Sequence, residues 1–221
     1  MSRSPAEVVT ALGRHDTSTV SDALDRLGRP GASLGILPIS PTLRAAGRAF
    51  TIRYGPMGAE GGTVGDYIDD VEPGSIVVLD NGGRLDCTVW GDILTTVASL
   101  RGVGGTAING VCRDVSRSLE LGYPLFSRGR AMVTGKDRVR VVEIGGEVSL
   151  GTVALRPGDV VIGDADGVVV VNDRWAAEVL EVADGIAAAE DRIRAAVQDG
   201  TGLAEARRAN GYFALQSRVG G

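Results

Sequence analysis

Three charged side chains lie at the ends of a predicted helix and a predicted strand, where they could act together on a small anionic substrate. Asp92 stands just before residues 93–100, whose apolar spacing predicts a helix, and the pair Arg113-Asp114 follows residues 106–109, an apolar run that predicts a buried strand. Arginine carries a fixed charged fork that matches a carboxylate, and aspartate is a ligand for hard divalent cations. These residue types therefore suggest a site for a carboxylate substrate and a metal ion.

The start of the predicted helix adds another kind of group to this candidate site. Backbone N–H groups in the first turn of a helix have no partner within the helix and favour anions. If the strand returns beside the helix start, the amides of Ile93 and Leu94, next to Gly91, converge with the charged side chains. Alone, the aspartate could be only a helix cap, and the Arg-Asp pair could be only a structural ion pair. Their combination favours function.

The composition excludes several other kinds of catalytic site. The chain has one histidine, His15, and two cysteines, Cys87 and Cys112. A zinc or iron–sulfur site built on such residues needs about three or four ligands, so neither kind of site is expected. Any metal must then sit on oxygen ligands, which points to Mg²⁺ or Mn²⁺. Lys136 is the one lysine and lies in a polar turn, so Schiff-base chemistry is not expected. We expect His15 at the surface or in a helix cap and Cys112 in the core.

Length and charge set the broad class of the protein. The 221 residues are 43% hydrophobic and 23% charged, which is typical of a globular protein, so we expect a single domain over residues 1–221. The formal net charge of -5 argues against binding to nucleic acid or to an anionic membrane. The longest apolar runs fall short of the roughly 18 residues of a membrane span, and the N-terminus lacks a signal-peptide pattern. We therefore expect a cytoplasmic location.

Helix and strand signals along the first half of the chain must position the candidate site. In order, these signals are a helix over 5–12, a helix from 17 to 27, a half-buried strand over 49–54, a glycine-rich loop over 55–65, a short acidic helix over 66–71 and a buried strand over 76–80. We expect the loop to be mobile, as a lid would be, and the acidic helix to present a solvated face.

The second half continues the mixture of helices and strands. The signals are a helix over 115–121, strands over 124–127 and 138–144, a hairpin turn over 164–167 and a long helix over 175–198. Glu190 falls beside the apolar stripe of that last helix, where it is either an edge residue or a carboxylate in need of a partner. Residues 200–221 form a polar tail that could reach another subunit.

The pattern of Asp92, twenty intervening residues and Arg113-Asp114 resembles that of the HMG/CHA aldolases. These are the divalent-metal-dependent class II pyruvate aldolases, and their relatives are the RraA proteins, named as regulators of ribonuclease E. The resemblance covers nearly the whole chain, and the segments that also carry it are 19–24, 113–115, 121–126, 156–159 and 164–168. The combined motif is specific for the superfamily and much less specific for the substrate.

The resemblance implies a fold, an assembly and roles for the candidate residues. The fold would be α/β, an α-β-β-α sandwich of the swivelling, phosphohistidine-like β/β/α type. The assembly would be a homotrimer or hexamer with its sites between subunits. Asp114 would ligate Mg²⁺ or Mn²⁺, and Asp92 would do so through water. Arg113 and the amides of Ile93 and Leu94 would hold the pyruvyl group, and Gly91 beside them would be a further substrate contact.

Two further positions relate to this pattern. The family usually has an acidic residue three positions after the aspartate of the Arg-Asp pair, where this chain has Arg117. The family also uses a glutamate from the C-terminal helix of the neighbouring subunit, and Glu190 is the nearest match here. Because the candidate site has no histidine, water or a carboxylate such as Asp92 or Glu190 would carry the protons.

The implied reaction is retro-aldol cleavage of a 4-hydroxy-2-oxo acid with release of pyruvate. The substrate would be of the 4-hydroxy-4-methyl-2-oxoglutarate or 4-carboxy-4-hydroxy-2-oxoadipate type, and oxaloacetate would be decarboxylated through the same enolate. The alternative is a non-catalytic protein that binds and regulates ribonuclease E, as RraA does. Methyltransferase activity is not expected, because the chain shows no strand followed by a glycine-rich loop for S-adenosylmethionine.

Overall fold

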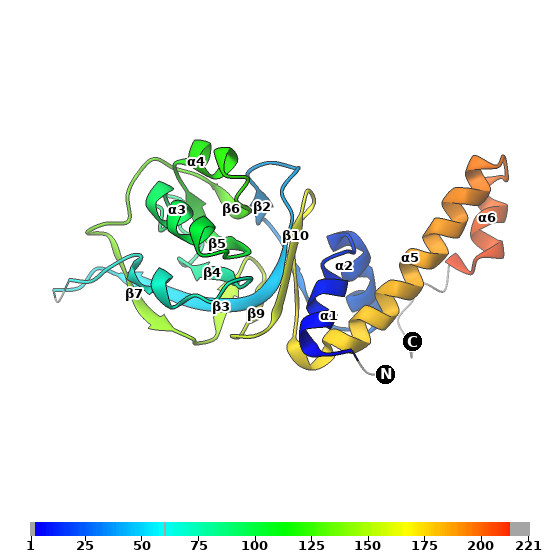
Figure 1. The fold of residues 1–221 in the computed structure, drawn as a ribbon, viewed down its shortest axis with the longest axis horizontal. Helices are drawn as coiled ribbons and strands as arrows, with labels where there is room; N and C mark the ends of the chain where they lie inside the picture. Colours follow the sequence, from blue (N-terminus) through cyan, green and yellow to red (C-terminus); the bar gives the residue numbers. More distant parts are fainter. Residues whose placement is uncertain (1–2, 60, 213–221) are drawn as a thin grey trace.

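A mixed β-sheet forms the centre of the protein (Figure 1). The computed structural model describes residues 3–59 and 61–212. The strands of this sheet are β1 (Ala32–Ser33), β2 (Leu37–Pro38), β3 (Ala45–Pro56), β4 (Ile76–Asp80), β5 (Gly105–Cys112), β6 (Leu125–Arg130), β7 (Val139–Ile144), β10 (Val160–Asp164) and β11 (Gly167–Val171). Their order is β1-β11-β10-β3-β4-β5-β6-β2, and β7 pairs with β3. β3, β4, β5 and β6 run parallel to one another, whereas β1, β2, β7, β10 and β11 pair antiparallel with their neighbours.

Helices pack around both halves of this sheet. Over the parallel half lie α3 (Asp92–Leu100), α4 (Val115–Glu120) and the 3-10 helix η1 (Asp66–Asp70). Against β10 and β11 lie α1 (Pro5–Leu12), α2 (Thr17–Arg26) and α5 (Ala176–Gln198), which the 3-10 helix η2 (Asp173–Trp175) precedes. The remaining elements are α6 (Leu203–Ala209) and a hairpin of β8 (Val148–Leu150) and β9 (Val153–Leu155).

Alternate side chains of the strands point into different apolar cores. In β4, Val77 and Leu79 face α3, whereas Ile76 and Val78 face the opposite side, where the hairpin of β8 and β9 covers the sheet. This is the two-residue period of a strand that is buried on both faces. A third core lies between β10–β11 and the helices α1, α2 and α5. The sheet is therefore held from both sides, which fixes the strand ends that carry the candidate site.

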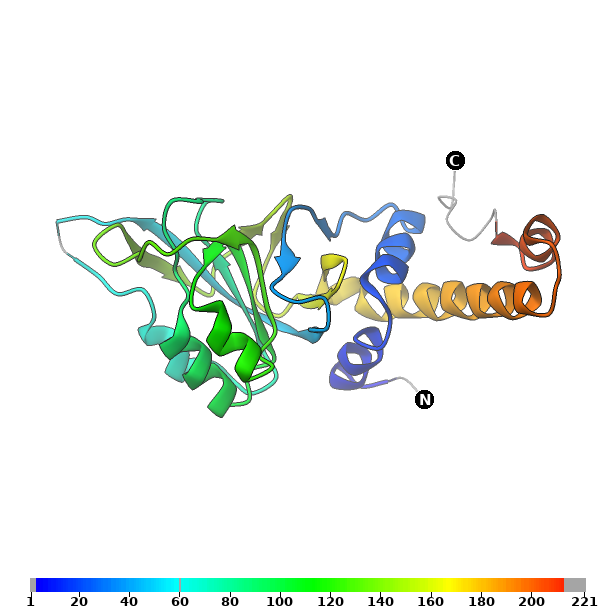
Figure 2. The same ribbon diagram turned by 90° about the horizontal axis from the view of Figure 1, so that it is seen from above.

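Helix α5 extends beyond the rest of the molecule (Figures 1 and 2). Its 23 residues span about 35 Å. Its first half packs against α1 and α2 through residues such as Val179 and Ala183, and α6 lies beside its far end. Among the described residues, no helix is both long enough and apolar enough to span a membrane.

The sequence predicted most of these elements and missed several short ones. Residues 66–70 form a 3-10 helix whose carboxylates Asp66, Asp69 and Asp70 are exposed, so the expected solvated face is confirmed, while its other side buries Tyr67 and Ile68. The polar tail contains α6, whereas residues 213–221 of it lie outside the described part. The hairpin of β8 and β9 was not predicted, because strands of three residues are too short to show a period. The fold is a mixed α/β single domain, and the swivelling sandwich stays a prediction.

Candidate functional site

Strand β5 delivers Arg113 and Asp114 to the start of α3. Every residue of β5 is buried, and its parallel pairing with β4 and β6 fixes its course. Just beyond its end, the N–H of Arg113 donates to the carbonyl oxygen of Trp90 at 3.2 Å, immediately before α3 begins. The expectation that this strand returns beside the helix start is therefore confirmed.

The three charged residues of the predicted site lie together. The backbone N–H of Asp92 donates to Oδ2 of Asp114 at 3.2 Å, and Nε of Arg113 lies 3.2 Å from the same oxygen. The side chains of Arg113 and Asp114 are 37% and 38% exposed. Because both contacts use Oδ2, the other carboxylate oxygen of Asp114 takes part in neither of them and is available to a ligand.

Asp114 has a backbone conformation that residues other than glycine rarely adopt. Its φ of 54° and ψ of 37° lie in the left-handed region. Aspartate tolerates this region better than most residues, but the strain still costs on the order of 1 kcal/mol and is typical of functional sites. The conformation lets one residue end β5, begin α4 and turn its carboxylate towards α3.

A glycine makes room for this carboxylate. A Cβ atom added at Gly91 would lie 2.8 Å from Oδ2 of Asp114 and 3.3 Å from Nε of Arg113. The first distance is too short for a carbon–oxygen contact, so a side chain at position 91 would displace the carboxylate. This spacing role is additional to the direct substrate contact that the sequence predicted for Gly91, which stays a prediction.

Two of the N–H groups in the first turn of α3 bind carboxylates of the site itself, and the start of the helix differs from one expectation. Gly91 is the N-cap and Asp92 the first helical residue, whereas the sequence predicted Asp92 as the cap. The reason is that Asp114, from a distant strand, accepts from the N–H of Asp92. The N–H of Ile93 donates to Oδ1 of Asp92 at 2.8 Å. The N–H of Leu94, in the same turn, has no acceptor within the helix and can serve a ligand.

A buried hydrogen-bond network, which the sequence did not predict, holds the start of α3 in place. Nε1 of Trp90 donates to Oγ1 of Thr95 at 2.9 Å, and that hydroxyl donates to the carbonyl of Gly91 at 2.9 Å. Oγ of Ser118, on α4, lies 3.2 Å from the same Oγ1. All three side chains are buried. The only sequence signal was a hydroxyl residue on the inward face of each helix.

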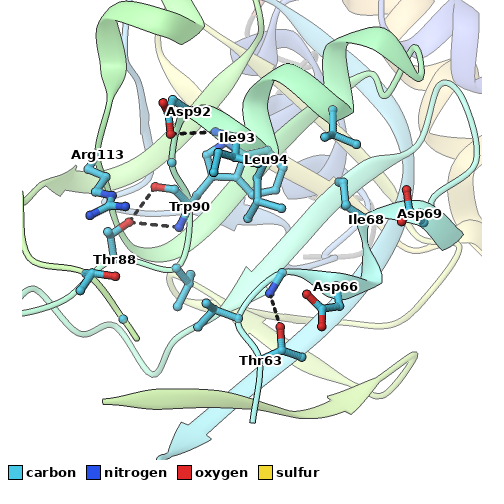
Figure 3. Close-up of a pocket in the computed structure, with 17 residues that line it drawn as sticks. Thr63, Asp66, Ile68, Asp69, Thr88, Trp90, Asp92, Ile93, Leu94 and Arg113 are labelled. Atoms are coloured by element: carbon cyan, nitrogen blue, oxygen red, sulfur yellow. Dashed lines mark hydrogen bonds between the residues drawn. The ribbon is translucent and has the colours of Figure 1, made fainter. Parts of the chain in front are cut away.

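A cleft of about 440 Å³ runs from this cluster along α3 to η1 (Figure 3). Arg113 and Asp92 stand at one end of it, and Asp66 and Asp69 stand at the other. The wall between the two ends is mostly apolar, with side chains from Val64, Ile68, Leu94 and Val97. The glycine-rich loop expected to act as a lid lines the cleft through residues 63–65, and the hydroxyl of Tyr54 donates to the carbonyl of Val64 at 2.6 Å.

The residues at the Arg113 end fit a hard divalent cation that takes few protein ligands. The cluster contains two carboxylates, those of Asp92 and Asp114, and the backbone N–H of Asp92 donates to the carboxylate of Asp114. Within the described part of the chain, no group of three or more His, Cys, Asp or Glu residues could hold a metal. Mg²⁺ commonly binds through one or two carboxylates and keeps water or substrate oxygens as its other ligands. The donor set therefore suits Mg²⁺ or Mn²⁺ and not zinc.

Arg117, which stands where the resembling family usually has an acidic residue, connects α4 to α3. Its Nε donates to Oγ1 of Thr96 at 3.1 Å, and its Nη1 lies 3.2 Å from Oε2 of Glu120. Where the family usually has an acidic side chain, this chain therefore has a guanidinium that links two helices.

Glu190 is not brought to the other predicted residues within one chain. It lies on α5, which points away from α3 (Figures 1 and 2), and its Oε2 lies 3.3 Å from Nη1 of Arg194. A catalytic part for Glu190 therefore requires a neighbouring subunit, as the resemblance implies, and stays a prediction.

The histidine and one cysteine have structural surroundings. Nε2 of His15 lies 2.8 Å from Oδ1 of Asp184, which joins the segment after α1 to α5. Cys112 is fully buried, and burial raises the pKa of its thiol. The prediction that Cys112 belongs to the core is confirmed.

Two relatives match most of this chain. The first is Protein DlpA from Legionella pneumophila, 37% identical over 195 residues, which are 87% of this chain but 32% of DlpA. This chain therefore spans about a third of DlpA. The second is a protein from Halalkalibacterium halodurans named "Putative 4-hydroxy-4-methyl-2-oxoglutarate aldolase", 30% identical over 201 residues, which cover 90% of this chain and 92% of the relative.

Solved structures agree with these matches. An uncharacterized protein from Pseudomonas syringae has a TM-score of 0.86 and 40% identity, covering 91% of this chain and 97% of that one. RraAS2 from Streptomyces coelicolor, described as an unusual member of the RNase ES inhibitor RraA family, has a TM-score of 0.78 and 27% identity over 88% of this chain and 98% of its own. The sequence model of the RraA-like family (Aldolase/RraA) matches residues 17–170. This chain therefore belongs to the RraA-like family.

Proposed function

We propose that this protein is a divalent-metal-dependent aldolase that cleaves a 4-hydroxy-2-oxo acid and releases pyruvate. The observation that carries the proposal is the convergence of Arg113, Asp114 and Asp92 with the first turn of α3 at one end of a cleft. The family supports this class of reaction, because its relative in Halalkalibacterium halodurans bears the name of such an aldolase.

Each residue at this end of the cleft has a part in binding the pyruvyl half of the substrate. The guanidinium of Arg113 would bind the C1 carboxylate through its fork, and the N–H of Leu94 would donate to an oxygen of the same half. Mg²⁺ or Mn²⁺, held by Asp114 and through water by Asp92, would supply Lewis-acid catalysis at the 2-oxo group.

Cleavage breaks the bond between C3 and C4 of the substrate. The C4 hydroxyl loses its proton and becomes a carbonyl, while the bonding electron pair stays on the pyruvyl half as an enolate. The fixed charge of Arg113 stabilises the negative charge that develops there. C3 then takes up a proton and pyruvate leaves. Asp92, or Glu190 of a neighbouring subunit, would move these protons directly or through water.

The resemblance suggests two diacids as substrates, 4-hydroxy-4-methyl-2-oxoglutarate and 4-carboxy-4-hydroxy-2-oxoadipate. Both share the pyruvyl half, and oxaloacetate shares its 2-oxo acid end and would lose CO₂ through the same enolate. We also propose a homotrimer or hexamer, because α5 carries Glu190 away from the cleft of its own chain.

A regulator that acts by binding another protein is the second candidate. It is favoured by the likeness to the Streptomyces coelicolor protein, which is described as belonging to the RNase ES inhibitor family. The feature that argues for the enzyme is the charged cluster in the cleft, since a binding surface has no need of Asp92, Arg113 and Asp114 around one helix end.

The test is pyruvate release from oxaloacetate and from 4-hydroxy-4-methyl-2-oxoglutarate, with Mg²⁺ or Mn²⁺ and again with EDTA. Asp114→Asn should fold with an unchanged Tm, because asparagine also tolerates the left-handed region, and should lose metal-dependent turnover. Arg113→Lys should lose roughly a hundredfold in kcat/KM, because a point charge cannot replace the fork. Near-normal turnover in either variant would reject these roles, and an inactive, folded, metal-loaded wild type would favour the binding role.

A further inference from the structure

The charges along the cleft are unevenly distributed. Among the described residues that line it, Arg113 is the one cation, whereas Asp66, Asp69 and Asp92 are carboxylates. Arg113 and Asp92 stand together at one end, and the other two carboxylates stand at the opposite end (Figure 3). A substrate that has its pyruvyl half at Arg113 therefore points its far end towards two negative charges.

An arginine beside these charges is engaged outside the cleft. Arg101, which follows α3, donates from Nη2 to the backbone carbonyl of Asp69, and its Nη1 lies 3.8 Å from the carboxylate of the same residue. It does not line the cleft. The walls next to this end come from Val64, Ile68 and Val97, which offer apolar contact, and from Thr63 and Gly65, which are polar or small but add no charge. The far end is therefore built for an uncharged group.

We propose that the preferred substrate is a monocarboxylic 4-hydroxy-2-oxo acid whose distal group is uncharged and apolar. This inference rests on the proposed function and narrows its substrate. A distal alkyl group would cover the apolar wall, whereas a distal carboxylate would lose water and meet Asp66 and Asp69 where no cation lines the cleft. The two diacids suggested by the resemblance would then be poor substrates.

The chemistry of the reaction needs no further reactant. Cleavage of 4-hydroxy-2-oxohexanoate, for example, breaks its C3–C4 bond, moves the proton of the C4 hydroxyl to solvent and adds a proton at C3. The products are pyruvate and propanal, which together contain all the atoms of the substrate. The enzyme would release a neutral aldehyde in place of a second 2-oxo acid.

A matched pair of unreactive acids tests the preference by binding. 2-Oxohexanoate and 2-oxoadipate have the same chain length and differ only in a terminal methyl or carboxylate. Isothermal titration of the metal-loaded protein should show that 2-oxohexanoate binds at least roughly tenfold more tightly. In turnover, kcat/KM for 4-hydroxy-2-oxohexanoate should exceed that for 4-hydroxy-4-methyl-2-oxoglutarate. Equal or tighter binding of 2-oxoadipate would overturn the proposal.

A charge reversal at the far end supplies the matched variants. Asp66→Arg should shift the binding ratio towards 2-oxoadipate by roughly tenfold or more, because it adds a cation at that end of the cleft. Asp70→Arg, an exposed position on the same 3-10 helix that does not line the cleft, should leave the ratio unchanged. The same shift in both variants would mean a general effect of surface charge, and would overturn the assignment of Asp66.

A second hollow gives the distal group an alternative place. It lies beside Asp114 and contains Arg130, whose Nη2 donates to the carbonyl of Ile39 at 2.8 Å. If the protein prefers 2-oxoadipate and Arg130→Gln abolishes that preference, the distal group lies in this hollow and the proposal is overturned.

Exchange of the C3 protons of pyruvate for deuterium, followed by NMR, separates this inference from the proposed function. Exchange needs only the pyruvyl end of the cleft. Exchange together with a preference for diacids would keep the aldolase and reject the apolar distal group. A preference for 2-oxohexanoate without exchange would keep the specificity of the cleft and reject the aldolase. If the protein shows no exchange and binds neither acid, both the inference and the proposed function are overturned.

Discussion

The position of the Asp114 carboxylate depends on its own backbone conformation and on the absence of a side chain at Gly91. Asp114 adopts a left-handed conformation that directs its carboxylate at the start of α3, and Gly91 leaves the space that this carboxylate fills. Strain of this kind persists where the surrounding structure holds it. Here the hydrogen bond from the N–H of Asp92 and the ion pair with Arg113 hold it. The arrangement makes position 91 as sensitive as the charged residues themselves.

Gly91→Ala should therefore damage activity more than stability. The new Cβ would lie 2.8 Å from Oδ2 of Asp114, so the carboxylate must move. A displacement of about 1 Å in a catalytic group costs up to about a hundredfold in rate, so we expect kcat to fall at least roughly tenfold and Mn²⁺ to bind more weakly. Enzyme assays and metal titration measure both, and thermal unfolding shows whether the fold survives.

Gly185→Ala is the matched control for this substitution. Gly185 is exposed in α5, and a Cβ there would meet nothing within 4 Å. Alanine should stabilise the helix by about 0.5–1 kcal/mol and leave turnover unchanged. Unchanged activity in Gly91→Ala would contradict the close packing around Asp114.

At the scale of elements, one buried hydroxyl, that of Thr95, joins the start of α3 to Trp90 and to Ser118 of α4. Thr95→Val keeps the shape of the side chain but removes Oγ1, which leaves Nε1 of the buried Trp90 without its acceptor. An unsatisfied buried donor costs about 1–3 kcal/mol, and urea unfolding should show a loss of that size. Thr96→Val, on the partly exposed side of α3, should cost less because water can replace its contacts with Arg117. Equal losses in both variants would speak against the network.

A carboxylate in β10 links α2 to the sheet and makes stability depend on pH. Asp164 accepts hydrogen bonds from the N–H of Thr17 at 2.8 Å, from its Oγ1 at 2.6 Å and from the N–H of Asp166 at 3.0 Å. Burial raises the pKa of Asp164, but these bonds favour the charged form more strongly and the net pKa is lowered. Asp164 also caps α2, since the side chain of Asp16 makes no capping bond.

Asp164→Asn should lose stability at neutral pH and lose less of it in acid. A lowered pKa in the folded state contributes stability that is complete above the unfolded value near 4, and that disappears as pH falls through the folded value. We expect a loss of about 1–2 kcal/mol at pH 7, narrowing as pH falls below about 4. Urea unfolding at several pH values measures it, with the exposed Asp166→Asn as control. A difference in unfolding free energy between wild type and Asp164→Asn that stays constant with pH would contradict the lowered pKa of Asp164.

These elements also show what the sequence could and could not predict. Local periodicity predicted the strands and helices that flank the site, and residue chemistry predicted that Asp92, Arg113 and Asp114 converge. The cap at Asp92 was wrong because its N–H is bound by Asp114, 22 residues away. The network at Thr95 and the space at Gly91 depend on distances between elements, which no local pattern contains. The burial of Tyr67 was missed for the same reason.

At the scale of the whole molecule, the long α5 separates one predicted residue from the rest. Glu190 pairs with Arg194 on this helix, which extends beyond α1 and α2 and away from the cleft (Figure 1). If Glu190 takes part in proton transfer, each active site must combine the cleft of one subunit with the helix of another. Such a shared site belongs to an assembly, because one chain cannot complete it.

Mixing two inactive variants tests this arrangement. Arg113→Ala damages the cleft and Glu190→Gln damages the helix, so each alone should be nearly inactive. In a mixture reassembled at equal amounts, half of the clefts are intact and half of the helices are intact. About a quarter of the sites should then combine both and regain activity. Arg113→Ala mixed with Asp92→Ala should regain nothing, because an intact cleft would need both residues from one chain. Full activity of Glu190→Gln alone, or no recovery in the first mixture, would show that Glu190 of a neighbouring subunit is not needed. Recovery in the control would show instead that Arg113 and Asp92 of one site come from different subunits.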